Sequence, residues 1–296
     1  MSESGETVTG REARASEAVR AASSPAYNAA VAMAFFRGAG KPQDAAPGTV
    51  LFSAGEKTAG LFSRDDRMYL VLEGEVVLQA GDYPLATVKA GELFGEMAAI
   101  THEPRTASAI ARTRCRLIAL DGRQFEQGLA QNPEFALMLM GVFSHRIRQT
   151  AAVLAARAGV AGAQRAQKPA PALDRTMMTG LRNLLRERTP ARYAAGQTIF
   201  RQGESAAFMY VVSAGTVAIL ADGHPIERVG PGGLFGEMAI VDQSPRSAAA
   251  QAETDCELMA LNRNDFLALV RTSPSFGRAL LRAMAARLAA VTAQLA

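Results

Sequence analysis

The sequence of 296 residues has few side chains of the kinds that point to metal, catalytic or nucleic-acid chemistry. It contains only four lysines and three histidines, and its net charge is only +4, which is too small a surplus to predict nucleic-acid binding. His102, His145 and His224 are scattered and do not have metal-ligand spacing. Walker loops, kinase motifs and Ser-His-Asp arrangements are also missing. We therefore expect no enzyme activity, metal, cofactor or nucleic-acid partner.

Cysteine and long apolar runs are equally scarce. Cys115 and Cys256 stand 141 positions apart, each just before an apolar run, and are expected to be small buried hydrophobic residues in a reducing, cytoplasmic compartment. The sequence contains no stretch of about 18 apolar residues, so we expect neither a membrane span nor a membrane partner. The first residues lack the basic start and apolar segment of a secretory signal.

One unusual motif occurs twice. Residues 94–105 read Phe-Gly-Glu-Met-Ala-Ala-Ile-Thr-His-Glu-Pro-Arg, and residues 235–246 read Phe-Gly-Glu-Met-Ala-Ile-Val-Asp-Gln-Ser-Pro-Arg. In each copy an arginine follows the Gly-Glu pair at the same distance. Such a combination can hold a small anion and a hydroxyl-rich group together.

The sequence around the motif is also repeated, which predicts a duplicated domain. The copies begin near residues 48 and 196, and the first carries seven extra residues before Met68, as expected for a surface-loop insertion. We predict the following organisation: a disordered or frayed tail over 1–24, a first domain over 25–158, a Gly- and Pro-containing linker over 159–173, and a second domain over 174–296.

Within each copy short β-type runs precede helical segments. Turn residues such as Ala221-Asp222-Gly223 separate the runs, and Pro133 and Pro274 each open a long helix. The predicted fold class is α+β: two consecutive eight-stranded β-barrels of double-stranded β-helix (jelly-roll-like) type, each with flanking helices and a long C-terminal helix. The scattered histidines argue against a metal-dependent cupin, a rival with a similar barrel.

The residue types in the motif suggest how a ligand is held. Gly95 lets the backbone approach a ligand, and unpaired N–H groups at the start of the following turn suit a phosphate. Arg105 can neutralise a phosphodiester and bond two of its oxygens. A phosphate at this place would repel the Glu96 carboxylate, unless the carboxylate faces away from it and accepts a hydrogen bond from a sugar hydroxyl. The alternative is a simple Glu–Arg salt bridge across the loop, but stability alone would not require the same spacing twice.

Phe-Gly-Glu-Met-Ala, followed by Pro-Arg-Thr-Ala or Pro-Arg-Ser-Ala, resembles the phosphate-binding cassette of the cyclic-nucleotide-binding domain family. That family includes bacterial cAMP receptor transcription factors, regulatory subunits of cAMP-dependent protein kinase and cyclic-nucleotide-gated channels. The resemblance covers nearly all of 48–158 and 196–296. It implies a cyclic nucleotide as ligand. A hydroxyl at the positions of Thr106 and Ser247 occurs both in cGMP-selective sites and in bacterial cAMP receptors, so cAMP and cGMP both stay candidates, and cAMP is the one we favour.

The resemblance also implies roles for individual residues. Glu96 and Glu237 would accept the ribose 2′-hydroxyl, and Arg105 and Arg246 would hold the cyclic phosphate. Gly95 and Gly236 would allow the tight turn of each site. The backbone N–H groups that complete the phosphate cradle would come from Met97, Ala98 and Thr106 in the first site and from Met238, Ala239 and Ser247 in the second. The family often has a bulky hinge residue next; Ile240 fits this pattern, whereas Ala99 departs from it.

The long helices carry an apolar seam with steps of three and four residues, at the same offset in both copies. Its members are Met140, Phe143, Ile147, Thr150 and Leu154, and Leu281, Met284, Leu288, Val291 and Leu295. A helix packed on its own barrel is favoured over a homodimer seam. The resemblance implies that this helix also covers the base, so Thr150, Val291 and Thr292 are candidate base contacts.

The leading hypothesis is a non-catalytic receptor with two cyclic-nucleotide sites that changes conformation to regulate a protein partner. A regulatory subunit that inhibits an enzyme through its tail, around 11–16 and 20–24, is the main alternative. A transcription regulator is expected to need a helix-turn-helix domain, for which we find no segment. A degenerate pair of barrels serving as a scaffold would not need both motifs intact.

Overall fold

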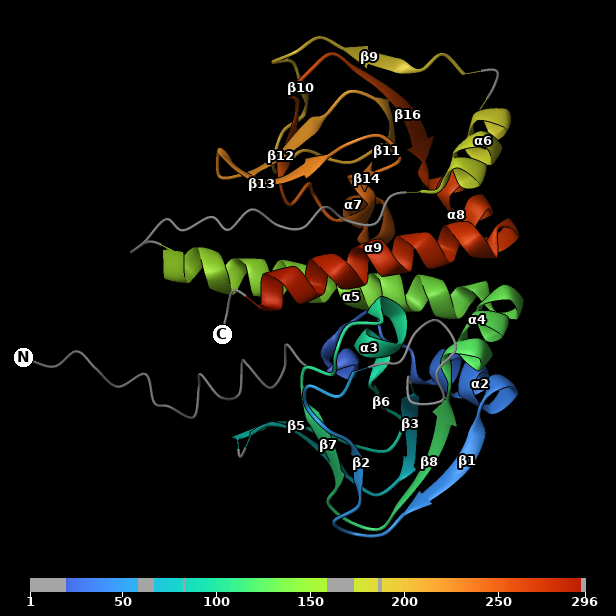
Figure 1. Ribbon diagram of the computed structural model, residues 1–296. Helices are drawn as coiled ribbons and strands as arrows, with labels where there is room; N and C mark the ends of the chain where they lie inside the picture. Colours follow the sequence, from blue (N-terminus) through green and yellow to red (C-terminus); the bar gives the residue numbers. More distant parts are fainter. Residues whose placement is uncertain (1–19, 58–66, 82, 159–172, 186–187, 294–296) are drawn as a thin grey trace, which may run out of the picture. The chain divides into compact units, whose positions relative to one another are not determined.

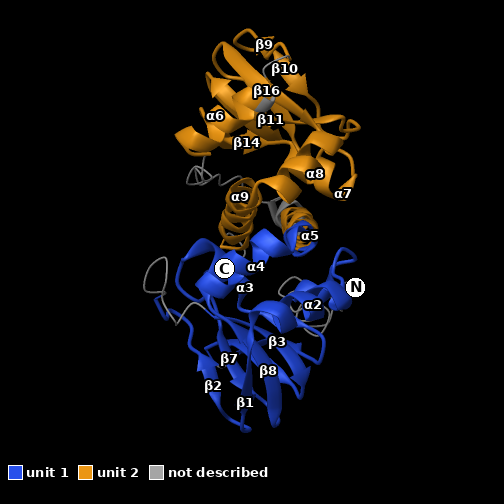
Figure 2. Ribbon diagram, turned by 90° about the vertical axis from the view of Figure 1, so that its right-hand side faces the viewer, with its two compact units in different colours: residues 1–138 blue, residues 139–296 orange. Residues whose placement is uncertain are grey.

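A computed structural model describes residues 20–57, 67–81, 83–158, 173–185 and 188–293. The chain divides into two compact units, Met1–Met138 and Leu139–Ala296 (Figure 2). The division falls within one long helix, so most of that helix belongs to the second unit. Each unit is described by itself below.

The first unit contains a helical entry, a set of short strands and two helices after them (Figure 1). In chain order the elements are η1 (Ala21–Ser23), α2 (Ala29–Ala39), β1 (Lys41–Ala45), β2 (Val50–Phe52), β3 (Met68–Glu73), β4 (Val76–Ala80), β5 (Tyr83–Val88), β6 (Leu93–Phe94), α3 (Glu96–Thr101), β7 (Ser108–Ala111), β8 (Cys115–Leu120), α4 (Gly122–Gln131) and the start of α5 (Pro133–Ala158).

The described strands of the first unit form two antiparallel four-stranded sheets, in the orders β1-β8-β3-β6 and β2-β7-β4-β5. In the first sheet β3 pairs with β8 from Met68 opposite Leu120 to Glu73 opposite Arg116. Alternate side chains of each strand point between the sheets, because successive residues of a strand face opposite sides. A double-sheet barrel is the result.

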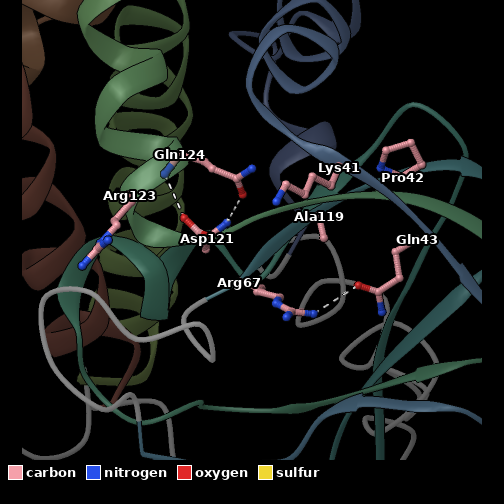
Figure 3. A pocket seen from close by; sticks show the side chains of 8 residues that line it. All are labelled: Lys41, Pro42, Gln43, Arg67, Ala119, Asp121, Arg123 and Gln124. Atoms are coloured by element: carbon pink, nitrogen blue, oxygen red, sulfur yellow. Dashed lines mark hydrogen bonds between the residues drawn. The ribbon is translucent and has the colours of Figure 1, made fainter.

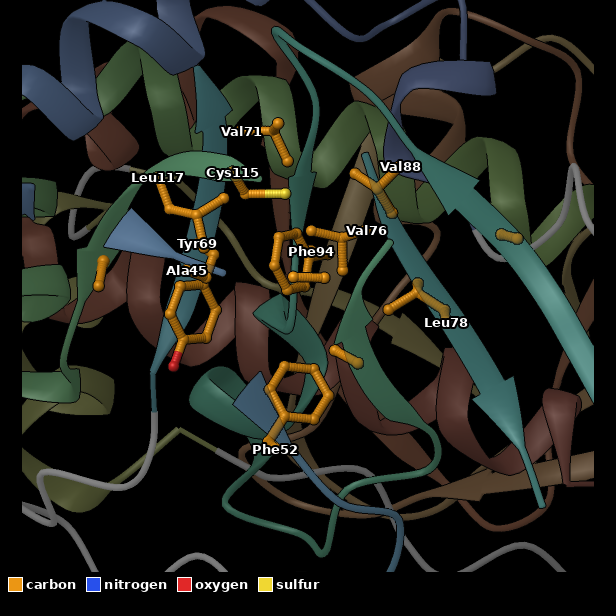
Figure 4. Packing of buried hydrophobic residues seen from close by; sticks show 14 residues of the cluster. Ala45, Phe52, Tyr69, Val71, Val76, Leu78, Val88, Phe94, Cys115 and Leu117 are labelled. Atoms are coloured by element: carbon orange, nitrogen blue, oxygen red, sulfur yellow. The ribbon is translucent and has the colours of Figure 1, made fainter. Parts of the chain in front are cut away.

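The core of the first barrel is built around three aromatic rings (Figure 4). Tyr69 and Phe94 stack with ring centroids 5.1 Å apart, and Phe52 lies about 6 Å from both. Aliphatic side chains from both sheets surround the rings, and Cys115 lies among them as a buried free thiol. The expected role of this cysteine as a small core residue is confirmed.

The second unit contains the rest of α5 and a second barrel with the same order of elements. These are α6 (Arg175–Leu184), β9 (Ala191–Tyr193), β10 (Thr198–Phe200), β11 (Phe208–Ala214), β12 (Val217–Ala221), β13 (His224–Val229), β14 (Leu234–Phe235), α7 (Glu237–Asp242), β15 (Ala249–Ala252), β16 (Cys256–Asn262), α8 (Arg263–Thr272) and α9 (Pro274–Thr292).

Its described sheets, β9-β16-β11-β14 and β10-β15-β12-β13, reproduce the strand orders of the first barrel. The aromatic trio recurs as well: Tyr210 and Phe235 stack at 5.3 Å, and Phe200 lies about 6 Å from both. Cys256 is again a buried free thiol. The predicted fold class, a duplicated jelly-roll-like barrel with helices, is confirmed.

Local signals in the sequence account for several boundaries. Pro133 and Pro274 are the first residues of α5 and α9, as predicted, because proline lacks the N–H that a first helical turn leaves unpaired. Asp222 and Gly223 both have positive φ and form the tight turn between β12 and β13. The hairpin expected there is confirmed.

The prediction of a disordered tail over 1–24 is wrong for residues 20–24. Ala21 and Ser24 are buried, and Arg20 forms an ion pair with Glu92 on the barrel. The side chains of this segment are mostly alanine and serine, which are small and give no apolar pattern, so the sequence did not indicate that they are buried. The remainder of the tail, 1–19, and most of the predicted linker, 159–172, lie outside the described residues.

Most of the described seam of the long helices is buried, whereas Val291 is partly exposed. Met140, Phe143 and Thr150 are at most 2% exposed, and Leu281, Met284 and Leu288 at most 1%. The side chains of Leu154 and Leu295 are outside the described set. Among the described helices, none combines the length and apolar character needed to span a bilayer.

Two glycines of the second barrel give a matched test of its packing. Gly215 and Gly223 share a positive φ, of 85° and 80°, but a Cβ at Gly215 would lie 2.2 Å from the Asp255 carbonyl oxygen, whereas a Cβ at Gly223 meets nothing within 4 Å. Gly223→Ala should cost about 1–2 kcal/mol of unfolding free energy from backbone strain. Gly215→Ala should cost roughly 1–3 kcal/mol more from overpacking.

Urea unfolding followed by far-ultraviolet circular dichroism measures both variants, since the chain has no tryptophan to report by fluorescence. Equal destabilisation of the two variants would contradict the close approach of Gly215 to Asp255.

Candidate functional site

A glycine in the left-handed conformation precedes each motif helix. Gly95 has φ 79° before α3, and Gly236 has φ 74° before α7. Glycine adopts this conformation without the strain that a Cβ would bring. Space is a second reason: a Cβ at Gly236 would lie 2.6 Å from Nη1 of Arg246. The glycine therefore makes both the turn and the room for the arginine.

The motif arginine of the second repeat is folded back onto the barrel. Nη1 of Arg246 donates to the Gly236 carbonyl at 2.7 Å, and Nη2 donates to the carbonyl of Phe208. The guanidinium carbon lies 3.9 Å from the centre of the Phe200 ring, within the range of a cation–π contact. Three separate parts of the chain thus fix the guanidinium.

The first repeat arranges Arg105 in the same way. Nη1 donates to the Gly95 carbonyl at 2.9 Å, Nη2 donates to the Arg67 carbonyl at 2.7 Å, and the guanidinium carbon lies 4.1 Å from the Phe52 ring centre. Phe52 and Phe200, which also belong to the two aromatic trios, therefore serve the core and the site together.

The arginine backbone is fixed as firmly as the side chain. The N–H of Arg246 donates to the Glu204 carbonyl at 2.9 Å, and its own carbonyl accepts from Gly203 at 2.9 Å. Arg105 makes the equivalent pair of bonds with Glu56 and Gly55. Both arginines are thus held in place by main-chain bonds to the loop that follows the second strand of their barrel.

The charge of Arg246 lacks an ionic partner among the residues described. Its side chain bonds only carbonyl oxygens, Nε is buried without a hydrogen-bond partner, and the residue is 5% exposed. Burial lowers the pKa of this guanidinium. A buried charge is costly unless an anion compensates it. The arrangement is therefore suited to receiving an anion at Nε.

The motif glutamate of the second repeat has a different partner. Glu237, 1% exposed in its side chain, forms an ion pair with Arg287 on α9, and Arg287 also bonds Glu227 of β13 through Nε at 3.0 Å and Nη2 at 3.2 Å. Nη2 of Arg287 donates further to the Leu234 carbonyl at 2.7 Å. The alternative of a Glu–Arg salt bridge within the motif is therefore wrong for this repeat.

Arg287 stays charged in this setting. Burial alone would lower its pKa, but the carboxylates of Glu237 and Glu227 outweigh burial and raise the pKa above its usual value. The ion pair therefore connects α9 to the motif glutamate.

A pocket of about 140 Å³ opens beside these groups in the second unit. Gly236, Glu237, Arg246 and Arg287 line its polar side. The apolar side includes aliphatic residues from the barrel and from both long helices: Ile219, Ala221, Ile226, Ile147, Ala151 and Val291. A charged end facing an apolar wall suits a ligand that carries an anion on one side and a flat apolar group on the other.

The remaining residues predicted from the sequence fall into three groups. Met238, Ala239, Ser247 and Val291 line the pocket, whereas Thr292 is exposed at the end of α9. Thr150 is buried on α5. In the first repeat, Glu96, Ala98 and Arg105 are buried near the start of α3, Met97 is partly exposed, and Thr106 is exposed.

Several residues of the pocket were missed from the sequence. The main one is Arg287, and Glu227, the second carboxylate that pairs with Arg287, was missed with it. One signal was available: Arg287 and Arg146 occupy equivalent positions in the two repeats, each directly before an apolar seam residue. No comparable signal exists for Glu227, because its counterpart in the first repeat is Ala86.

A larger hollow of about 870 Å³ in the first unit is a different feature (Figure 3). It contains none of the motif residues, and its carboxylate, Asp121, caps α4 by accepting from the N–H of Gln124 at 2.9 Å. Arg67 there donates to Gln43. Across the described residues, no group of three or more His, Cys, Asp or Glu side chains is placed to hold a metal ion.

Comparison with known proteins gives a consistent result. The family model described as "Cyclic nucleotide-binding domain" matches residues 42–132 and 190–273. A cAMP-dependent protein kinase regulatory subunit of Eremothecium gossypii is 39% identical over 109 residues, 37% of this chain and 23% of that protein. The Cyclic AMP receptor protein of Thermus thermophilus is 40% identical over 101 residues, 32% of this chain and 47% of that protein.

The matched segments span less than half the length of either curated relative. Among solved structures, the regulatory domain of Toxoplasma gondii PKA with cAMP is 20% identical and superposes with a TM-score of 0.31, covering 91% of this chain and 95% of that one.

Removing Arg287 tests the ion-pair arrangement. Arg287→Leu should cost about 3–5 kcal/mol of unfolding free energy, because two buried carboxylates lose their counter-charge.

Arg228→Leu is the matched control, because its partner Glu253 and its own side chain are exposed. It should cost at most about 1 kcal/mol of unfolding free energy. Similar costs for the two variants in chemical denaturation would show that the Arg287 arrangement is not buried in solution.

Proposed function

Because the chain belongs to the cyclic nucleotide-binding domain family, we propose that it is a non-catalytic receptor that binds a cyclic nucleotide, cAMP, once in each repeat. Binding changes the arrangement of the helices and so regulates a protein partner. The observation that carries this proposal is the buried Arg246 guanidinium, which is held by carbonyls and an aromatic ring and whose Nε has no hydrogen-bond partner among the described residues.

In the second site the cyclic phosphate accepts a hydrogen bond from Nε of Arg246. The N–H groups of Met238, Ala239 and Ser247 surround the same oxygens, and Gly236 leaves space for them. A bent diester supplies the negative charge that the buried guanidinium lacks, and a charge-assisted bond of this kind is among the stronger hydrogen bonds in proteins.

The ribose 2′-hydroxyl is the partner of Glu237. A carboxylate has two oxygens and several lone pairs, so Glu237 can accept the hydroxyl while it remains paired with Arg287. The sugar thus meets a carboxylate that α9 also contacts. Ligand binding and the position of α9 are then linked, because a ligand favours the conformation that it binds more tightly.

The base lies against the apolar wall of the pocket, where Val291 of α9 and Ile226 of β13 present aliphatic surface. A wall of this kind binds a purine by removing its flat faces from water. The volume of about 140 Å³ is below the roughly 300–1,000 Å³ usual for ligand pockets, so the lining must move to admit a nucleotide. This supports a change of conformation on binding.

The first site uses the same chemistry, with Arg105 for the phosphate, Glu96 for the ribose, and Gly95, Met97, Ala98 and Thr106 around them. The equivalent contacts of the two arginines support this assignment. The choice of cAMP over cGMP rests on the names of the relatives, a cAMP-dependent kinase subunit and a Cyclic AMP receptor protein.

The resemblance to a kinase regulatory subunit favours one further function, inhibition of an enzyme by the N-terminal tail. Its segment 11–16 lies outside the described residues. A pull-down with and without cAMP distinguishes this function from that of a free-standing sensor: a partner released by cAMP supports inhibition.

Isothermal titration of the full chain with cAMP should give about two sites per chain, and Arg246→Ala should lose roughly 2–5 kcal/mol of binding free energy at one of them. Arg228→Ala, on the same barrel but outside the pocket, is the control and should bind like the parent. Absence of heat with both cAMP and cGMP would contradict the function. Unchanged affinity in Arg246→Ala would remove Arg246 from the site.

A further inference from the structure

The pocket of the second site takes part of its lining from a helix that follows the first barrel in the chain. Ile147, Arg148 and Ala151 of α5 all line it. Positions separated by three or four residues share one face of a helix, so Ile147 and Ala151 present a continuous apolar surface there. The second repeat on its own therefore supplies an incomplete pocket.

Resting on the proposed function, we propose that the second cyclic-nucleotide site is composite. Helix α5 completes its wall, and Arg148 of that helix is a positioning residue that fixes the loop carrying the phosphate-binding Arg246. The occupant is the same cyclic nucleotide, and the new assignment concerns which part of the chain builds its site.

The bonds from α5 reach both ends of the loop before Arg246. Arg148 forms a bidentate ion pair with Asp242, the last residue of α7, through Nε to Oδ2 at 2.7 Å and Nη2 to Oδ1 at 3.2 Å. Its Nη1 donates to the carbonyl of Pro245 at 3.0 Å. Ser144, one turn earlier, donates to Oδ2 of Asp242 at 2.6 Å. Residues 242–245 are thus fastened to one face of α5.

The pair is more than an exposed surface contact. The Arg148 and Asp242 side chains are 24% and 16% exposed. Burial raises the pKa of Asp242, but the bonds from Arg148, Ser144 and the N–H of Ser244 outweigh it and leave the pKa below its usual value. Asp242 is therefore ionised at neutral pH, and the bidentate geometry adds direction as well as attraction.

The first repeat provides an internal comparison. At the offset of 141 residues, Thr101 stands in place of Asp242, Ala285 in place of Ser144 and Ala289 in place of Arg148. Thr101 instead bonds the Met97 carbonyl within its own helix. The equivalent helices α3 and α9 thus lack all three of these side chains, although the barrel and the motif are the same. The fold does not require the contact, so it is a specific property of the second site.

The consequence for binding follows from the chain connection. The Pro245 carbonyl belongs to the peptide unit that leads into Arg246, so Arg148 limits the movement of the residue that grips the phosphate. A loop already held in the bound geometry loses less freedom when the ligand arrives. By reciprocity, a nucleotide in the second site stabilises the contact with α5.

The test uses the full chain in an Arg105→Ala background, so that titration with cAMP reports the second site. Arg148→Met keeps the length of the side chain but removes its charge, and should weaken binding about tenfold, whereas Arg148→Lys keeps one charged contact and should stay within about threefold. Asp242→Asn removes the charge from the other partner and should also weaken binding about tenfold. The double variant Arg148→Met/Asp242→Asn should be no weaker than either single variant.

Arg228→Met, which breaks an exposed pair on the same barrel, is the control and should bind like the Arg105→Ala parent. Equal losses in Arg148→Met and Arg148→Lys, or unchanged affinity in both Arg148→Met and Asp242→Asn, would overturn the positioning role and leave the proposed function standing. If the Arg105→Ala chain itself fails to bind cAMP, the proposed function at the second site fails first.

Discussion

Each repeat buries an arginine whose guanidinium is held by main-chain carbonyls and the face of a phenylalanine ring, and the rest of the site depends on this placement. The glycine before the motif helix makes room for the guanidinium, and the aromatic trio of the core supplies its ring. In the second repeat the buried Nε of Arg246 has no hydrogen-bond partner among the described residues. A buried positive charge of this kind is costly without an anion in contact with it, which is why we propose an anionic ligand.

The two repeats separate what the fold needs from what one site adds. Both barrels share strand order, aromatic trio, glycine conformation and arginine contacts. The first barrel has Ala86 where the second has Glu227, the partner of Arg287, and it has Thr101 where the second has Asp242, the partner of Ser144 and Arg148 on α5. These additions connect the second pocket to α9 and to α5. The two sites are therefore expected to differ in coupling, although their motif arginines make equivalent contacts.

The sequence was sufficient to predict the duplicated barrels, the proline-initiated helices and the buried cysteines, because these follow from repeats, periodicity and local propensity. The recurring Gly-Glu…Arg motif also predicted residues that line the second pocket, Gly236, Glu237 and Arg246. Arg287 and Arg148 were missed because an arginine on a helix usually lies in water. Their partners Glu227 and Asp242 are 60 and 94 residues away, so only the packing of α9 and α5 brings them together. Residues 20–24 were mistaken for a tail because small side chains give no apolar pattern.

The most direct measurement is the ¹⁵N–¹H resonance of the Arg246 side-chain Nε–H in the full chain, assigned with an Arg246→Lys variant, before and after saturation with cAMP. The account predicts that this resonance shifts and that its proton exchanges more slowly with water, because the phosphate oxygen takes up the open donor. An Nε–H signal that is unchanged while cAMP is bound would contradict the central claim.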